Sequence, residues 1–163
     1  CPTGHYLVKK EIARTGAKLA GEMSGDIFFN ATWYGFDDAI YTAARLLRIL
    51  SQDSRNSEEI FASFPESCST PEINIAVPDH EKFNLIKKII EAAENGKFSG
   101  AKIITLDGLR IEFPHGFALI RVSNTSPCFV LRFEANKVLE LQEIQSRFRA
   151  FLLECAPHMK WDF

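Results

Sequence analysis

Two short polar segments of the sequence carry residue types that could bind a small polar ligand. The first, the Glu22 loop, reads Gly21-Glu22-Met23-Ser24-Gly25-Asp26 and lies between two apolar stretches. Its glycines would let a ligand approach the backbone closely. Glu22 could accept hydrogen bonds from two neighbouring hydroxyl groups of a sugar, and Ser24 could donate or accept one more. Because the same residue types are common in hairpin turns, a plain structural turn remains the alternative interpretation.

The second polar segment, the Arg121 loop, reads Arg121-Val122-Ser123-Asn124-Thr125 and follows an apolar stretch. It brings together a guanidinium, two hydroxyls, an amide and successive backbone N–H groups, which are the groups that bind phosphate in proteins. Arg132, on the next predicted strand, could point at the same place. The alternative interpretation is an ordinary Ser/Asn/Thr turn beside an arginine that is held in a structural salt bridge. The residue types alone leave both interpretations open.

The residues that carry the Glu22 loop are expected to form part of an α/β domain. The strongest helical pattern runs from Phe36 to Ser51, with apolar residues at helical spacing and with Asp37 and Asp38 in its first turn. Its apolar face needs a partner, and two short strands are too small to supply one. The other elements expected here are a helix over 5–15, strands over 18–23 and 27–30, and a short helix over 57–63.

The Arg121 loop is expected in a second, separate unit. Phe64 to Pro71 contains two prolines among serines and is interpreted as an interdomain linker. The remaining residues predict a β-α-β-β-β-β-α unit with a hairpin at Asp107-Gly108 and an N-cap at Asn136. Phe83 and Leu139 are placed on the core faces of its two helices. The expected strands are 72–77, 101–106, 109–113, 117–122 and 128–135, and the expected helices are 79–95 and 136–155.

Composition and charge exclude several classes of protein. The formal net charge of -2 over 163 residues argues against a broadly basic surface for nucleic acid. No apolar stretch approaches the length of a membrane span. The cysteines, Cys1, Cys68, Cys128 and Cys155, are too far apart for a metal knuckle or a redox pair. They favour a reduced, cytoplasmic location. A start at Cys1, without an initiator methionine, suggests a piece of a longer protein.

In combination, these motifs resemble those of the α-D-phosphohexomutase family. The Glu22 loop, followed by Trp33 to Asp38, is similar to the sugar-binding loop of that family and the helix after it. The Arg121 loop is similar to the phosphate-binding loop of its last domain. Thr3-Gly4-His5 resembles a turn of the third domain, and Ser69 to Glu72 matches the hinge before the fourth. The resemblance covers essentially the whole chain and is closest to the bacterial phosphomannomutase/phosphoglucomutase branch.

The resemblance implies a fold and a reaction. Residues 1–66 would be the C-terminal part of α/β domain III, and residues 70–163 would be α+β domain IV, a mainly antiparallel, TBP-like sheet with two helices. The full enzyme would interconvert hexose 1-phosphate and hexose 6-phosphate through a bisphosphorylated sugar and an enzyme phosphoserine. Neither a Thr-Ala-Ser-His-like serine loop nor an Asp-Gly-Asp-like magnesium loop occurs here. The phosphoserine, the Mg²⁺ site and the other domains would therefore lie outside this chain, which alone should be inactive.

The resemblance also implies which residues bind substrate. The ligands would be the 1- and 6-phosphates of glucose and mannose and the hexose 1,6-bisphosphate, with no catalytic residue in this part. One departure is Asp26, which stands where the family usually has histidine; an aspartate would repel a nearby phosphate and accept hydroxyl bonds instead. The implied substrate-binding residues are His5, Glu22, Met23, Ser24, Gly25, Asp26, Arg121, Val122, Ser123, Asn124 and Thr125.

Two other classes of function remain open at this point. The chain could be a stand-alone, non-catalytic module that binds phosphosugars. It could also be a protein-interaction domain that uses the open face of the sheet in residues 72–135. The second alternative predicts large apolar residues on both faces of those strands.

Overall fold

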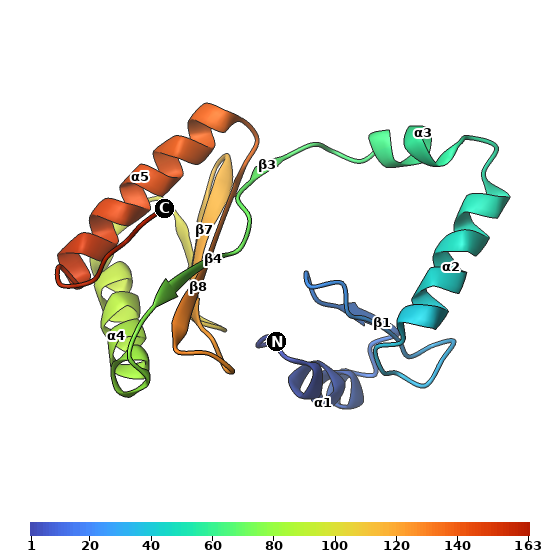
Figure 1. Ribbon diagram of the computed structural model, residues 1–163, viewed down its shortest axis with the longest axis horizontal. Helices are drawn as coiled ribbons and strands as arrows, with labels where there is room; N and C mark the ends of the chain where they lie inside the picture. The colour runs from blue at the N-terminus through green and yellow to red at the C-terminus, as the bar shows by residue number, and fades with distance from the viewer. The chain divides into compact units, whose positions relative to one another are not determined.

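The computed structural model describes residues 1–163, which divide into two compact units, Cys1–Pro65 and Glu66–Phe163 (Figure 1). The N-terminal unit holds helices and a two-stranded antiparallel ribbon, in which Ala20 of one strand faces Phe28 of the other. Its small core is formed by Val8, Ile12 and Phe28. Its elements are α1 (His5–Thr15), β1 (Leu19–Gly21), β2 (Ile27–Phe29), α2 (Ala39–Gln52) and α3 (Ser57–Ala62).

Helix α2 starts later than the sequence predicted. It begins at Ala39, so Asp37 and Asp38 lie before the helix and not in its first turn. Asp38 is instead the N-cap, and its carboxylate accepts a hydrogen bond of 2.9 Å from the N–H of Tyr41. A capping carboxylate satisfies one of the N–H groups that a helix end leaves free.

The apolar face of α2 lies exposed, as its pattern predicted. No residue of the helix is buried, and Ile40 is 84% exposed. Leu47 and Ile49 are also exposed. The three-residue core of this unit cannot cover a stripe of that length, because two strands of three residues each offer too little surface.

The C-terminal unit is built on an antiparallel sheet of six strands. Its strand order is β5-β6-β7-β8, and β3 and β4 both pair with the outer edge of β8. Cys68 and Ser69 pair with Ala135 and Glu134, so the segment interpreted as a linker contributes an edge strand. The strands are β3 (Cys68–Ser69), β4 (Ile73–Ala76), β5 (Lys102–Ile104), β6 (Leu109–Phe113), β7 (Gly116–Val122) and β8 (Cys128–Ala135).

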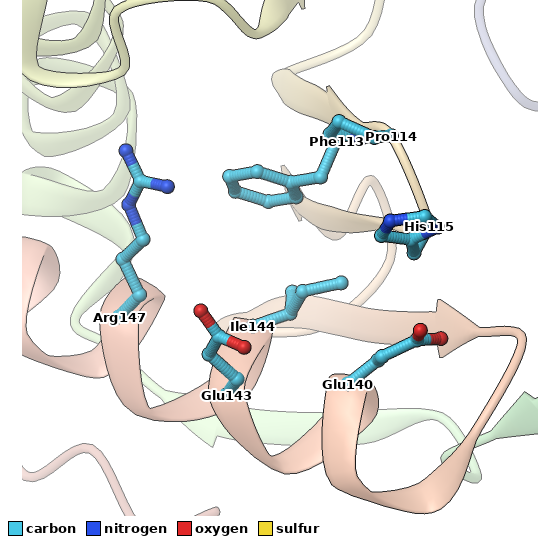
Figure 2. A pocket seen from close by; sticks show the side chains of 7 residues that line it. All are labelled: Phe113, Pro114, His115, Glu140, Glu143, Ile144 and Arg147. Atoms are coloured by element: carbon cyan, nitrogen blue, oxygen red, sulfur yellow. The ribbon is translucent and has the colours of Figure 1, made fainter.

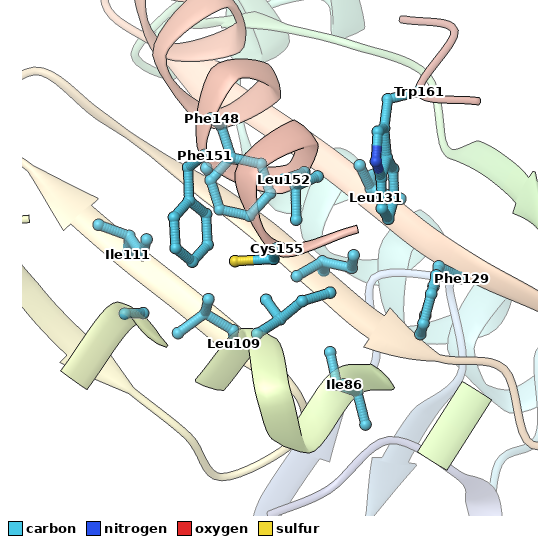
Figure 3. Packing of buried hydrophobic residues seen from close by; sticks show 14 of the residues in the cluster. Ile86, Leu109, Ile111, Phe129, Leu131, Phe148, Phe151, Leu152, Cys155 and Trp161 are labelled. Atoms are coloured by element: carbon cyan, nitrogen blue, oxygen red, sulfur yellow. The ribbon is translucent and has the colours of Figure 1, made fainter. Parts of the chain in front are cut away.

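Two helices cover one face of this sheet and leave the other open (Figure 1). They are α4 (Asp79–Ala92), which continues into the short π-helix η1 (Ala93–Lys97), and α5 (Val138–Cys155). Gly96 has a φ of 93° and ends the first helix, as predicted. Neither helix, nor any other in the chain, is long and apolar enough to cross a membrane. Aromatic and aliphatic side chains fill the space beneath the helices, among them Ile86, Leu109, Ile111, Phe129, Leu131, Phe148, Phe151, Leu152 and Trp161 (Figure 3).

Two side chains that the sequence analysis placed in this core are exposed. Phe83 of α4 is 57% exposed and Leu139 of α5 is 78% exposed. In each helix the buried residues include other positions than the one predicted. Lys82, Leu85, Ile86 and Ile89 are the buried residues of α4, and Ile144, Phe148, Phe151, Leu152 and Cys155 are those of α5.

The start of α5 also differs from its prediction. Lys137, not Asn136, is the N-cap residue, and its side chain makes no capping hydrogen bond. Asn136 is used by the sheet instead, since its N–H donates to the carbonyl of His115 over 3.0 Å. This bond extends the pairing of β7 with β8 by one residue beyond Ala135, which faces Gly116.

The hairpin predicted at Asp107-Gly108 joins β5 to β6, with a longer loop than expected because β5 already ends at Ile104. Gly108 has a φ of 79°, which favours glycine. A Cβ at this position would lie 2.2 Å from the carbonyl oxygen of Ile120 on β7. Gly108 therefore lets this loop approach the backbone of the strand that carries Arg121.

Candidate functional site

The Arg121 loop lies at the turn between the two central strands of the sheet. Arg121 is the penultimate residue of β7 and faces Val130 of β8. The strands stay joined beyond that pair, because Ser123 N–H donates to the carbonyl of Cys128 over 3.0 Å. Within the loop, Cys128 N–H donates to the carbonyl of Ser126 over 2.9 Å, which tightens the turn before β8 begins.

Two residues of the Arg121 loop have structural roles. Ser123 is buried, and its Oγ accepts hydrogen bonds from the N–H of Thr125 (3.4 Å) and of Ser126 (3.1 Å). The side chain of Val122 packs against the hydrophobic core. Asn124 and Thr125, in contrast, are exposed. The groups of this turn that are available to a ligand are therefore the side chains of Asn124 and Thr125 and the N–H of Asn124.

Arg121 points to the open face of the sheet and makes no hydrogen bond or ion pair within the chain. Arg132 lies on the same face, two residues from the partner of Arg121 on β8, and its buried Nε also has no partner. The third arginine of this face, Arg110, is held by Glu112 at 3.2 Å and stacks on Phe117. The structural salt bridge required by the alternative interpretation of Arg121 is absent.

The Glu22 loop closes the two-stranded ribbon of the N-terminal unit. Its backbone forms a tight turn, in which Glu22 N–H donates to the carbonyl of Asp26 over 2.9 Å and Gly25 N–H donates to that of Glu22 over 3.1 Å. Gly25 has a φ of 100°, a conformation that other residues rarely adopt. Met23 is exposed at the tip. The backbone of this turn thus holds the five predicted site residues from Glu22 to Asp26 close together.

Side chains of the Glu22 loop differ in whether they have partners. Ser24 Oγ donates a hydrogen bond to the carboxylate of Asp26. Asp26 therefore engages the hydroxyl that the sequence analysis assigned to a ligand. Glu22 Oε1 is buried and has no hydrogen-bond partner. Because a buried carboxylate oxygen is costly to leave unsatisfied, Glu22 is the side chain of this turn that most needs an external donor.

His5 is the remaining predicted contact, and it is paired within its own unit. Its Nδ1 lies 2.7 Å from the carboxylate of Asp37, and its ring packs against Phe28 at 5.6 Å. The hydrogen bond from His5 lowers the pKa of Asp37 below its usual range. Sequence reasoning missed this partner, since Asp37 was assigned to the first turn of the following helix. His5 and Asp37 join the start of α1 to the residues before α2.

The open face of the sheet is mixed in character. Its strands carry Lys102, Arg110, Glu112, Arg121, Arg132 and Glu134 beside the apolar Ile104, Phe117, Leu119 and Val130. Large apolar residues on both faces were the signature expected of a protein-interaction domain. Charged residues alternate with apolar ones on this face, so its composition alone does not select that alternative.

A small pocket at the other end of β7 is a poor match for a phosphosugar. It has a volume of about 120 Å³ between α5 and the turn that joins β6 to β7 (Figure 2). Glu140 and Glu143 line it and would repel an anionic ligand, while Arg147 lies over the rings of Phe98 and Phe113. The histidine of this turn, His115, also lines it, and we assign it no role in binding.

Comparison with protein families matches both units. Residues 1–68 match the family model described as phosphoglucomutase/phosphomannomutase, alpha/beta/alpha domain III. Residues 72–151 match the model described as phosphoglucomutase/phosphomannomutase, C-terminal domain. The two matches follow one another in the order that their descriptions give.

Individual relatives agree with these models. The chain is 52% identical over 161 residues to a phosphomannomutase/phosphoglucomutase of Pseudomonas syringae pv. tomato, covering 99% of this chain and 34% of that protein. It is 49% identical over 160 residues to a phosphoglucomutase of Neisseria gonorrhoeae, covering 98% and 34%. A crystal structure of a phosphoglucomutase/phosphomannomutase family protein from Burkholderia thailandensis matches with a TM-score of 0.88 and 45% identity, covering 99% and 33%. The chain thus spans about a third of the length of these proteins.

Proposed function

Because this chain belongs to the α-D-phosphohexomutase family, as its C-terminal part, we propose that it supplies the substrate-binding loops of a mutase that interconverts hexose 1-phosphate and hexose 6-phosphate. The observation that carries the proposal is the unpaired guanidinium of Arg121, beside a turn that exposes Asn124 and Thr125. An arginine without a carboxylate partner next to free donors is suited to a phosphate group.

In this proposal the Arg121 loop binds the phosphate that is not being transferred. The guanidinium can donate two parallel hydrogen bonds to phosphate oxygens, and the N–H of Asn124 and the hydroxyl of Thr125 can donate two more. Arg132, on the same face of the sheet, adds a second unpaired cation. Ser123 and Val122 contribute by shaping the turn and not by touching the ligand through their side chains.

The Glu22 loop binds the sugar ring in the same proposal. The unpartnered carboxylate oxygen of Glu22 accepts from ring hydroxyls, and Met23 provides an apolar contact. The substrate must bind in two orientations, one for each end of the hexose. Glu22 therefore takes hydroxyls that glucose and mannose share. Asp26 accepts from Ser24 and does not offer a cation to the phosphosugar, so positive charge must come from elsewhere, as it does from Arg121.

In our proposal, the residue that donates and recovers the phosphate lies outside this chain. A phosphoserine supplied by another part of the enzyme donates and recovers the phosphate, with Mg²⁺ beside it. No group of three or more His, Cys, Asp or Glu side chains in this chain could hold a metal ion. Because the proposal assigns the phosphoserine to another part of the enzyme, we expect the chain alone to bind phosphosugars weakly and to catalyse nothing.

A chimera tests the proposal. The corresponding third of the Pseudomonas syringae relative, which is 52% identical, is replaced by these 163 residues. The chimera should convert glucose 1-phosphate and mannose 1-phosphate to their 6-phosphates, while the chain alone should show no turnover. Turnover by the isolated chain that survives further purification would contradict the proposal. So would a folded chimera that acts on neither sugar phosphate.

A further inference from the structure

Only two polar or charged residues of the chain are buried, and they meet at the Arg121 loop. Lys82 is 6% exposed and Ser123 is 7% exposed. Lys82 lies near the start of α4, on the stripe of that helix that faces the sheet. Its side chain crosses to the turn between β7 and β8, where its Nζ donates to the carbonyl of Ser123. A charged side chain is rarely buried unless its hydrogen bonds are satisfied, so the acceptors of Lys82 need to be identified.

All three N–H groups of the Lys82 ammonium have acceptors. Its Nζ lies 3.2 Å from Ser123 O, 3.3 Å from Ser126 O and 2.6 Å from the carboxylate of Asp79. The two carbonyls belong to the two ends of the turn, and Asp79 comes from the same helix as the lysine. Because an ammonium has three donors and no acceptor, this set uses its whole capacity.

The bond to Ser123 O fixes the direction in which the next N–H points. A trans peptide is planar, so the C=O of one residue and the N–H of the next point in opposite directions. No peptide bond of the chain is cis. Since the carbonyl of Ser123 points inward to Lys82, the N–H of Asn124 points outward to the exposed side of the turn. That N–H has no acceptor within the chain.

We propose that Lys82 is a positioning residue for phosphate binding, which it supports by holding the carbonyls of Ser123 and Ser126 away from the ligand. Without the ammonium, the Ser123–Asn124 peptide loses the bond that fixes its carbonyl. Rotation of that peptide would present a carbonyl oxygen to the phosphate in place of an N–H. The inference rests on the proposed function of the Arg121 loop.

Amide spectra of the isotope-labelled 163-residue chain, titrated with inorganic phosphate, test the inference. Lys82→Met keeps the length and apolar stem of the side chain but removes its donors. It should raise the Kd for phosphate by about tenfold or more, and the shift of the Asn124 amide on binding should shrink. Lys87→Met is the matched control, because Lys87 is exposed on the same helix and loses the same charge. Lys82→Arg, which retains charge and donors, should bind within about threefold of the unsubstituted chain.

The variants separate this inference from the proposed function. If Arg121→Ala abolishes the phosphate-induced shifts while Lys82→Met binds like Lys87→Met, the positioning role is wrong and the phosphate site stands. If Arg121→Ala also changes nothing, the proposed function fails with it. Should Lys82→Met lose the dispersed core resonances of the sheet, Lys82→Leu, which also lacks donors, decides. A folded Leu variant that binds within about twofold of the unsubstituted chain would overturn the inference.

A second readout distinguishes positioning from general support of the fold. In the chimera, Lys82→Met should raise KM for glucose 1-phosphate by about tenfold and leave kcat nearly unchanged, because the held phosphate binds alike in ground and transition states. A variant that lowers only the amount of folded enzyme would reduce the apparent kcat at constant KM. That result would assign Lys82 a structural role alone.

Discussion

Replacement of Arg121 by alanine is the substitution whose consequence follows most directly from the structure. The guanidinium makes no hydrogen bond or ion pair with another side chain of the chain, so its loss removes no internal ion pair. A bidentate, charge-assisted contact to phosphate contributes about 1.5–3 kcal/mol. That range corresponds to roughly a 10- to 150-fold loss of affinity. The unpaired Arg132 on the same face remains and favours the lower part of the range.

The assay is steady-state turnover of the chimera with glucose 1-phosphate and with mannose 1-phosphate. Arg121→Ala should raise KM for both sugars by a similar factor, since this loop does not contact the ring, and should change kcat little. Arg121→Lys keeps the charge without the planar fork, so its KM should lie between those of the parent chimera and of Arg121→Ala. Arg48→Ala is the control for loss of a cation, because the side chain of Arg48 is exposed on α2 without a hydrogen bond or ion pair.

Two results would refute this reasoning. If Arg121→Ala lowered the melting temperature and left both kinetic constants unchanged, the arginine would be a structural residue after all. If KM rose for one sugar and not for the other, the side chain would contact the ring and not the phosphate.

Three other substitutions test separate parts of the account. Glu22→Gln in the chimera should lower both binding and kcat, because it loosens the ring during reorientation; kinetics equal to those of the parent would return the Glu22 loop to a plain turn. Phe148→Ala should destabilise the C-terminal unit by about 3–5 kcal/mol in urea unfolding, and the exposed Leu139→Ala on the same helix by less than about 0.5 kcal/mol; equal losses would contradict the assigned face of α5. The carboxyl of Asp37 should titrate below its ordinary pKa of 3.8, and His5→Ala should raise that midpoint while His115→Ala should not. Because the folded pKa is the lower one, the stabilisation from this pair is present above pH 3.8 and is lost as the pH falls through the folded pKa.

Local patterns in the sequence were sufficient to predict the main elements. The bounds of α1, β6 and β8 are those that periodicity and turn residues indicate, since each depends on residues adjacent in the chain. Both polar loops also fall at turns between paired strands, as expected. The exposed apolar face of α2 was predictable, because the sequence of this unit shows only two short strands, which are too small to cover the helix.

Which residue near the start of α4 is buried depends on tertiary packing and was not predicted from the sequence. The sequence analysis placed Phe83 on the core face of α4 and assigned no role to Lys82, whereas the structure buries Lys82 and exposes Phe83. Position 82, however, stands three, four and seven residues before Leu85, Ile86 and Ile89, and so shares their face of the helix. A lysine at the helical spacing of buried apolar residues could therefore have been recognised in the sequence as a candidate buried charge. Its meaning depends on the carbonyls of Ser123 and Ser126, which only the fold brings near.

The same limit applies to individual site residues. The sequence assigned His5 and Ser24 to a ligand, and the structure shows that each also has a protein partner, Asp37 and Asp26 respectively. Ser123 was expected to touch phosphate, and the structure shows that its buried hydroxyl oxygen also accepts hydrogen bonds from the turn itself. Hydrogen bonds between side chains that are distant in sequence, or that close a turn, leave no periodic trace.

The most direct test of the central claim is a map of where glucose 1-phosphate binds on the isolated chain. Amide spectra recorded during a titration up to about 20 mM cover the weak affinity expected of a partial site. The largest shifts should fall on Arg121, Asn124 and Thr125, with smaller ones on the Glu22 loop. Shifts centred on the pocket beside His115, or none at either loop, would contradict the claim that this chain carries the phosphosugar-binding loops of the enzyme.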